Sequence, residues 1–65
     1  MKITKEARMH LETAELLIRG IQQSVRFNDS NLGFPPPEHS MESIKRRCIQ
    51  ARQELLQLEH GISPY

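Results

Sequence analysis

The sequence predicts an all-α fold: a single domain over residues 1–65, folded as an antiparallel two-helix hairpin. Two segments carry apolar residues at alternating steps of three and four, and a segment with three consecutive prolines separates them. Steps that average 3.5 residues are typical of helices that pack closely and nearly antiparallel. We expect one helix over about 5–26, a proline-rich loop over about 27–39 and a second helix over about 41–60.

The first helix is predicted by one unbroken apolar stripe, with Thr4 placed to cap its start. The stripe contains Ala7, Leu11, Ala14, Ile18, Ile21 and Val25. We expect its larger members to form the core of the hairpin or of a dimer; these are Leu11, Ile18, Ile21 and Val25.

The second helix carries the same pattern, begins after Ser40 as its N-cap, and ends at Gly61. Its stripe contains Met41, Ile44, Cys48, Ala51, Leu55, Leu58 and Ile62. The corresponding core prediction is Ile44, Cys48, Leu55 and Leu58.

The loop holds both phenylalanines and the prolines at 35–37, which cannot continue a helix. Phe27 and Phe34 have two interpretations. They plug the open end of the hairpin, or they anchor a partner protein on a stiff extended segment.

Composition limits the function classes. The formal net charge of +1 is far from the basic balance of a domain that binds through phosphate contacts, so nucleic acid is an unsupported partner. A single cysteine closes no intrachain disulfide and fits a reducing compartment. No apolar run is long enough to span a membrane. We expect a cytoplasmic protein without a membrane partner.

Catalytic and metal chemistry find no support in the residue pattern. The candidate metal ligands are scattered without ligand spacing: His10, His39, Cys48 and His60. Glu12 and Glu15 have no predicted pocket around them that would perturb a carboxyl group. We expect no enzyme, no cofactor and no metal.

A 65-residue hairpin buries little surface, so we expect self-association into an antiparallel four-helix bundle, a homodimer related by a two-fold axis. An unidentified protein partner is expected as well. The predicted partner contacts are Met9, Leu16 and Gly20 on the first helix, Phe34 in the loop, and Arg46, Arg47 and Arg52 on the second helix.

In size and architecture alone, the chain resembles the small helical-hairpin accessory proteins that bacteria and phages encode to bind larger host proteins. That resemblance implies a non-catalytic protein-binding regulator or adaptor. Two alternatives remain open: a nucleic-acid-binding dimer that uses a composite Arg/Lys face, and a purely structural assembly subunit.

Overall fold

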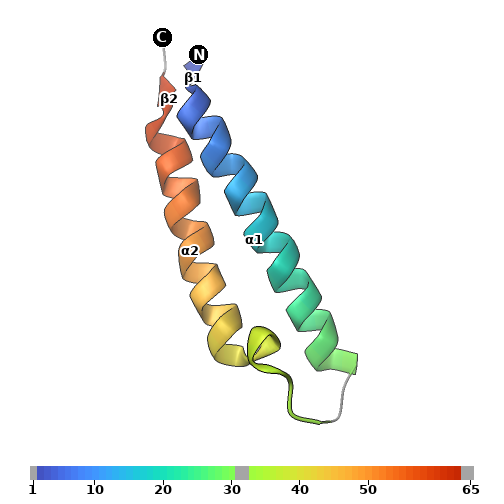
Figure 1. Cartoon of the computed structure of the whole chain (residues 1–65). Coiled ribbons are helices and arrows are strands. Elements are labelled where there is room, and N and C mark those ends of the chain that lie inside the picture. The colour runs from blue at the N-terminus through green and yellow to red at the C-terminus, as the bar shows by residue number, and fades with distance from the viewer. Residues whose placement is uncertain (1, 31–32, 64–65) are drawn as a thin grey trace.

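In the computed structural model, which describes residues 2–30 and 33–63, two long antiparallel helices form a hairpin 52 Å long and 15 by 14 Å across (Figure 1). Helix α1 spans Lys5–Ser30 and helix α2 spans Met41–His60. A short 3₁₀ turn, η1, spans Pro37–His39 before α2. The predicted all-α hairpin is confirmed.

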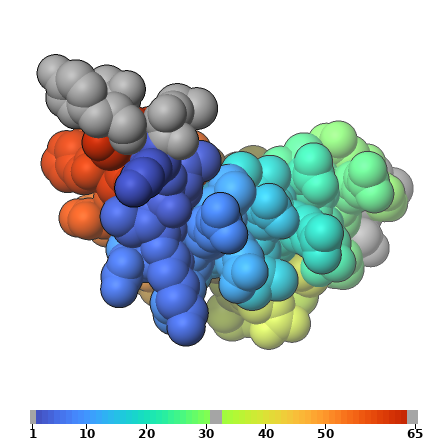
Figure 2. All heavy atoms as spheres, turned by 90° about the horizontal axis from the view of Figure 1, so that it is seen from above, coloured from blue at the N-terminus to red at the C-terminus, as the bar shows by residue number. Residues whose placement is uncertain are grey.

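Two short strands tie the ends of the chain together. Strand β1, Lys2–Ile3, pairs antiparallel with strand β2, Ile62–Ser63, so that Ile3 lies opposite Ile62. The Thr4 N–H also donates to the Gly61 carbonyl at 3.2 Å. The first turns of α1 therefore lie against the last turn of α2, as the view from above shows (Figure 2).

Both predicted N-caps are present. The Ala7 N–H donates to the Thr4 hydroxyl at 3.1 Å, and the Ser43 N–H donates to the Ser40 hydroxyl at 3.2 Å. Each hydroxyl satisfies a backbone donor that the first helical turn would leave without a partner. The start of α2 is therefore where the sequence predicts it.

The end of α1 differs from the prediction by four residues, because the helix continues to Ser30 rather than to residue 26. Asn28, a residue that favours turns, is held in the helix by two hydrogen bonds. Its side-chain amide donates to the Ser24 carbonyl at 2.8 Å and to the His39 carbonyl at 2.7 Å. This amide joins the last turns of α1 to η1.

Gly61 ends α2 as predicted, and its φ of −86° is open to any L-residue. Its role is to allow close approach, since a Cβ added there would lie 2.4 Å from the Ala7 Cβ. Glycine therefore permits the contact between the two helices at the open end of the hairpin.

We call the line of contact between the two helices the seam. Its residues are buried or half-buried and follow steps of three and four. On α1 they are Ala7, His10, Ala14, Leu17, Ile21, Ser24 and Asn28, and on α2 they are Ile44, Arg47, Ala51, Glu54 and Leu58, followed by the C-cap Gly61. Ile21, Ile44 and Leu58 are the large apolar residues that the sequence placed here correctly.

At alternate positions the apolar residues of the two predicted stripes do not form the core of the single hairpin. The exposed members are Leu11, Ile18, Val25, Met41, Cys48, Leu55 and Ile62. The cause is the size and polarity of their neighbours. Small residues let the helices approach, and polar side chains that pair across the seam occupy the layers between them. The alternative, that such residues form the core of a dimer, stays a prediction.

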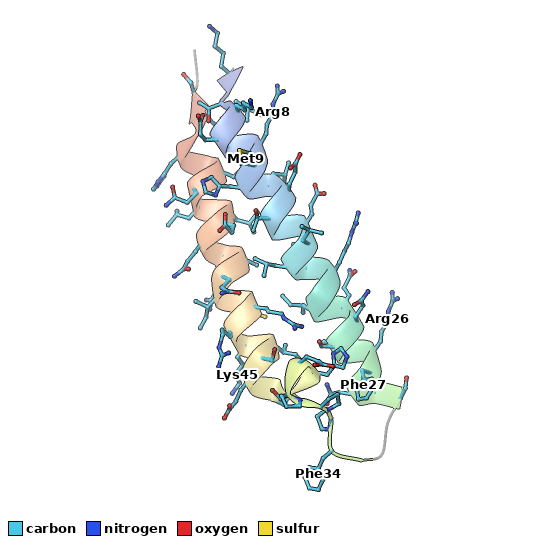
Figure 3. The ribbon with its side chains drawn as sticks, viewed as in Figure 1. Arg8, Met9, Arg26, Phe27, Phe34 and Lys45 are labelled. Carbon is cyan, nitrogen blue, oxygen red and sulfur yellow. The ribbon has the colours of Figure 1, made fainter. Side chains whose placement is uncertain are left out.

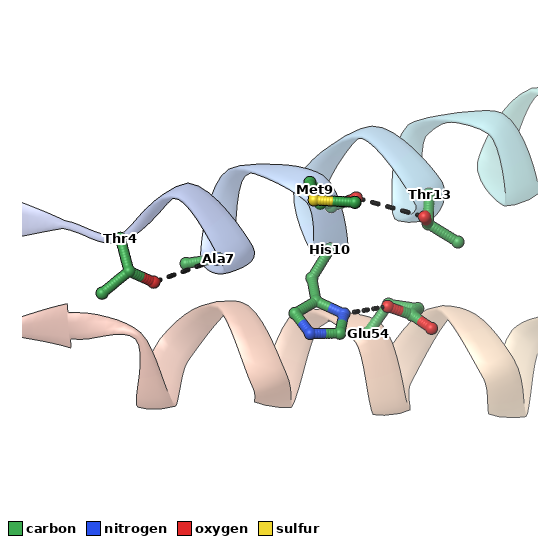
Figure 4. A network of polar contacts seen from close by, with 6 residues as sticks. All are labelled: Thr4, Ala7, Met9, His10, Thr13 and Glu54. Atoms are coloured by element: carbon green, nitrogen blue, oxygen red, sulfur yellow. Dashed lines mark hydrogen bonds and ion pairs between the residues drawn. The ribbon is translucent and has the colours of Figure 1, made fainter.

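Polar side chains pair across the hairpin. His10 Nδ1 contacts Glu54 Oε2 (Figure 4). The Arg47 guanidinium donates to the Ser24 hydroxyl at 2.9 Å, and the Ser24 oxygen lies 2.8 Å from His39 Nδ1. Among the described residues, only Ala7, Ala14, Ala51 and Ser24 are buried. The hairpin therefore has a narrow core with little apolar bulk.

Candidate binding surface

Six apolar residues line one outer face of the hairpin, and we call this set the outer stripe. Its members recur every seven residues and are all exposed: Leu11, Ile18 and Val25 on α1, and Met41, Cys48 and Leu55 on α2. The five members other than Cys48 have exposed fractions from 39% at Leu11 to 63% at Met41. Contiguous exposed apolar surface of this kind marks an interaction site.

Helix geometry places the two halves of the outer stripe on the same side of the hairpin. Leu11 and Ile18 each follow a seam residue of α1 by one position, and Cys48 and Leu55 do the same on α2. Viewed from one end of the hairpin, successive residues turn clockwise along the helix that runs away from the viewer and anticlockwise along the helix that runs toward the viewer. The same step from the seam therefore leads to the same face on both antiparallel helices.

The two halves are also level with each other along the hairpin. The strands pair Ile3 with Ile62, and the Arg47 guanidinium reaches the Gly20 carbonyl at 3.4 Å. On this register the outer stripe forms three layers: Leu11 with Leu55, Ile18 with Cys48, and Val25 with Met41.

Charged and polar residues flank the outer stripe. On α1 they are Arg8, Glu15 and Gln22, each three positions before a member of the stripe. On α2 they are Lys45 and Arg52, three positions before Cys48 and Leu55, and Glu59, three positions before the exposed Ile62. All six are exposed. An apolar strip with a charged margin on each side is the arrangement found at helix-packing interfaces.

A second apolar group lies on the outer face of α1. Met9 and Leu16 are 59% and 66% exposed, and Met9 is on the side of the hairpin that faces the viewer in Figure 3. Gly20, which the sequence grouped with them, is half-buried beneath the Arg47 side chain. Met9 and Leu16 are therefore accessible to a partner, whereas Gly20 serves the hairpin itself.

The predicted arginine contacts do not form one patch. Arg47 lies in the seam, where it donates to Ser24 and to the Gly20 carbonyl. Arg46 and Arg52 are exposed, but their spacing of six residues directs them to different sides of α2. Arg46, Arg47 and Arg52 therefore share no common face of the single hairpin.

The two phenylalanines have different environments. Phe27 stacks on the His39 ring with centroids 4.7 Å apart, so it closes the loop end of the seam. Phe34 is fully exposed and points away from both helices (Figure 3). The plug interpretation is correct for Phe27 and wrong for Phe34, which remains available as an anchor.

The candidate metal ligands stay apart. Within residues 2–30 and 33–63, no three His, Cys, Asp or Glu side chains gather where they could hold a metal ion. His10 pairs with Glu54, and His39 faces Ser24 and Phe27. Neither helix, over its described length, is apolar enough to cross a bilayer.

Comparison with known proteins adds no relative. No family model matches the sequence, and no curated protein or solved structure is significantly similar to it.

The outer stripe combines residues that the sequence singled out with an arrangement that it did not reveal. Leu11, Ile18 and Leu55 were predicted as core on apolar spacing alone. The seam residues also follow seven-residue spacing, as His10, Leu17 and Ser24 illustrate. The seam and the outer stripe are therefore one position apart on each helix and share the same spacing. Which of the two sets is buried in the hairpin depends on which residues face each other across it.

Proposed function

We propose that this chain is a small non-catalytic protein-binding regulator or adaptor that acts as a homodimer of helical hairpins. In the dimer, the outer stripes of two copies pack together as the core of an antiparallel four-helix bundle. The observation that supports this most strongly is the contrast between six exposed apolar residues on one face and a buried set of three alanines and one serine.

We expect a second copy of the chain to cover the outer stripe, because its own outer stripe has the same spacing of apolar residues. The outer stripe repeats every seven residues on both helices, so an identical stripe offers layers at the same spacing. Burying both stripes also removes from water the large apolar side chains that the hairpin leaves exposed.

The regulated partner would contact surfaces that dimerisation leaves free. Met9 and Leu16 are exposed on the face of α1 opposite the outer stripe, as helix periodicity places them, and Phe34 projects from the loop (Figure 3). Exposed aromatic and flexible apolar side chains are typical anchors for another protein.

Light scattering over a concentration series, with circular dichroism on the same samples, tests this proposal. We expect a helical species at twice 7.6 kDa. A helical monomer at all concentrations would refute the dimer. Oligomers that keep growing with concentration would indicate an open-ended assembly subunit instead.

A further inference from the structure

We propose that the second copy is related by a two-fold axis parallel to the helices, so that α1 of each copy lies on α2 of the other and both loops lie at the same end of the bundle. This inference rests on the proposed dimer and specifies its geometry. The charges that flank the outer stripe support this orientation of the axis.

A two-fold axis through the middle of the outer stripe has two orientations that pack every helix against antiparallel neighbours. The axis parallel to the helices keeps each residue at its own level and stacks α1 on α2 of the second copy. The axis perpendicular to the helices stacks each helix on its own reversed copy. Both orientations bury the three apolar layers, so apolar packing alone does not choose between them.

The parallel axis brings opposite charges together. Arg8 is level with Glu59, and Glu15 is level with Arg52, within the hairpin register. Within one copy, the flanking residues of α1 and those of α2 lie on opposite edges of the outer stripe, so they do not contact each other. In a dimer with the parallel axis, each of them lies beside the oppositely charged residue of the second copy. The two-fold axis repeats both contacts and gives four opposite-charge pairs.

The perpendicular axis is less favourable. It brings Arg8 near Asp29 of the second copy, but Glu15 then faces the neutral Gln22. On α2 it places Lys45 against Arg52 of the second copy, twice by symmetry, and like charges at the margin of a helix interface oppose association. Charge complementarity therefore favours the parallel axis.

The favoured geometry also has a consequence for partner binding. Both loops would extend from one end of the bundle, with two fully exposed Phe34 side chains close together. A partner could then engage two aromatic anchors at once, and the second contact would gain from the high effective concentration.

Reversing the charge of Arg52 distinguishes the two axes, because one axis predicts a weaker dimer and the other predicts a dimer that is as tight or tighter. For Arg52→Glu we expect the dimer dissociation constant to rise roughly tenfold, since the variant places Glu against Glu15. The perpendicular axis would instead make Arg52→Glu bind as tightly as the wild type or more tightly, because it removes the clash with Lys45. The double variant Glu15→Arg/Arg52→Glu should restore wild-type affinity to within about threefold.

Arg46→Glu is the matched control. It makes the same change of charge on an exposed residue that points away from the outer stripe, so we expect the dimer affinity to stay unchanged. An equal loss of affinity in this control would attribute the Arg52→Glu effect to net charge and overturn the inference.

Loop-to-loop distance provides an independent test. Nitroxide labels at Glu38→Cys in a Cys48→Ala background should lie within about 20 Å of each other in the dimer, because both labels are at the same level and packed helices are about 8–10 Å apart. The perpendicular axis passes at the level of Cys48, so it would separate the two labels by about 30 Å along the bundle, at about 1.5 Å per residue on either side of the axis. A distance of about 30 Å or more would overturn the inference while leaving the dimer intact. A sample that is monomeric by light scattering would overturn both.

Discussion

The seam between α1 and α2 combines small and polar side chains with four half-buried large apolar ones, Leu17, Ile21, Ile44 and Leu58, whereas the outer stripe consists of exposed large apolar side chains and Cys48. The seam has Ala7, Ala14 and Ala51 at its closest points, and Arg47 and Ser24 meet across it at 2.9 Å. The outer stripe consists of Cys48 and five larger apolar residues whose exposed fractions are 39% or more.

These two regions contribute different things to the fold. A polar side chain in the seam needs a polar partner on the other helix, as His10 has in Glu54. Because few positions offer such a partner, the polar pairs of the seam fix which residues face each other. Large side chains such as Leu55 and Ile18 supply the burial, but only where a second surface covers them. The seam therefore sets the register of the two helices, and the outer stripe provides further apolar surface that stabilises the fold once a second copy covers it.

The largest effect is expected from a charge placed in the outer stripe. Leu55→Asp would bury an unpaired carboxylate in the dimer, at a cost of about 3 kcal/mol or more per copy. We expect loss of the dimer by light scattering and a large drop in helical signal. Leu56→Asp is the matched control, because Leu56 is exposed on another face of α2 and should keep the dimer. A dimeric Leu55→Asp variant would contradict the comparison.

A smaller effect is expected at the closest approach in the seam. Gly61→Ala adds a Cβ that would sit 2.4 Å from the Ala7 Cβ, and relieving this contact requires the helices to separate. We expect a loss of about 1–3 kcal/mol, measured by thermal unfolding at fixed protein concentration. At Gly33 an added Cβ meets nothing within 4 Å, so Gly33→Ala should leave the melting temperature nearly unchanged.

The polar part of the seam should respond to loss of its arginine. Arg47→Met keeps much of the side-chain length but removes the donors to Ser24 and to the Gly20 carbonyl. We expect a loss of about 1–2 kcal/mol in the free energy of unfolding. Arg46→Met, on an exposed neighbour, should change it by less than about 0.5 kcal/mol. Equal effects of the two substitutions would argue against a structural role for Arg47.

The smallest effect is expected at a helix start, away from both surfaces. Ser40→Ala removes the hydroxyl that accepts the Ser43 N–H, which should cost about 1 kcal/mol. Ser43→Ala is the control, since Ser43 contributes its backbone N–H to this bond and would retain it. A thermal melt in which both variants behave alike would exclude the cap as the cause.

Local features of the fold could be predicted from the sequence. Thr4 and Ser40 cap helices because a hydroxyl acceptor next to free backbone N–H groups needs no information about distant residues. The boundaries of α2 follow from the same local chemistry. The end of α1 could not be predicted, because Asn28 is held by the His39 carbonyl, which lies across the loop.

The candidate site was only half predictable for a related reason. Apolar spacing identified Leu11, Ile18 and Leu55 as residues that need burial, and that inference used local periodicity alone. It could not decide whether the neighbouring helix or another chain covers them. The deciding contacts, such as Arg47 with Ser24, join residues that are 23 positions apart in the sequence.

The native thiol at Cys48 tests the central claim most directly, because it lies in the middle layer of the outer stripe and is exposed in the single hairpin. We would measure the rate of its alkylation by a maleimide over the concentration range in which the mass is followed. The account predicts that alkylation slows in proportion to the fraction of dimer, since only the monomer exposes the thiol. A dimer whose Cys48 reacts as fast as the monomer's would contradict the account, because the two copies would then meet through another face.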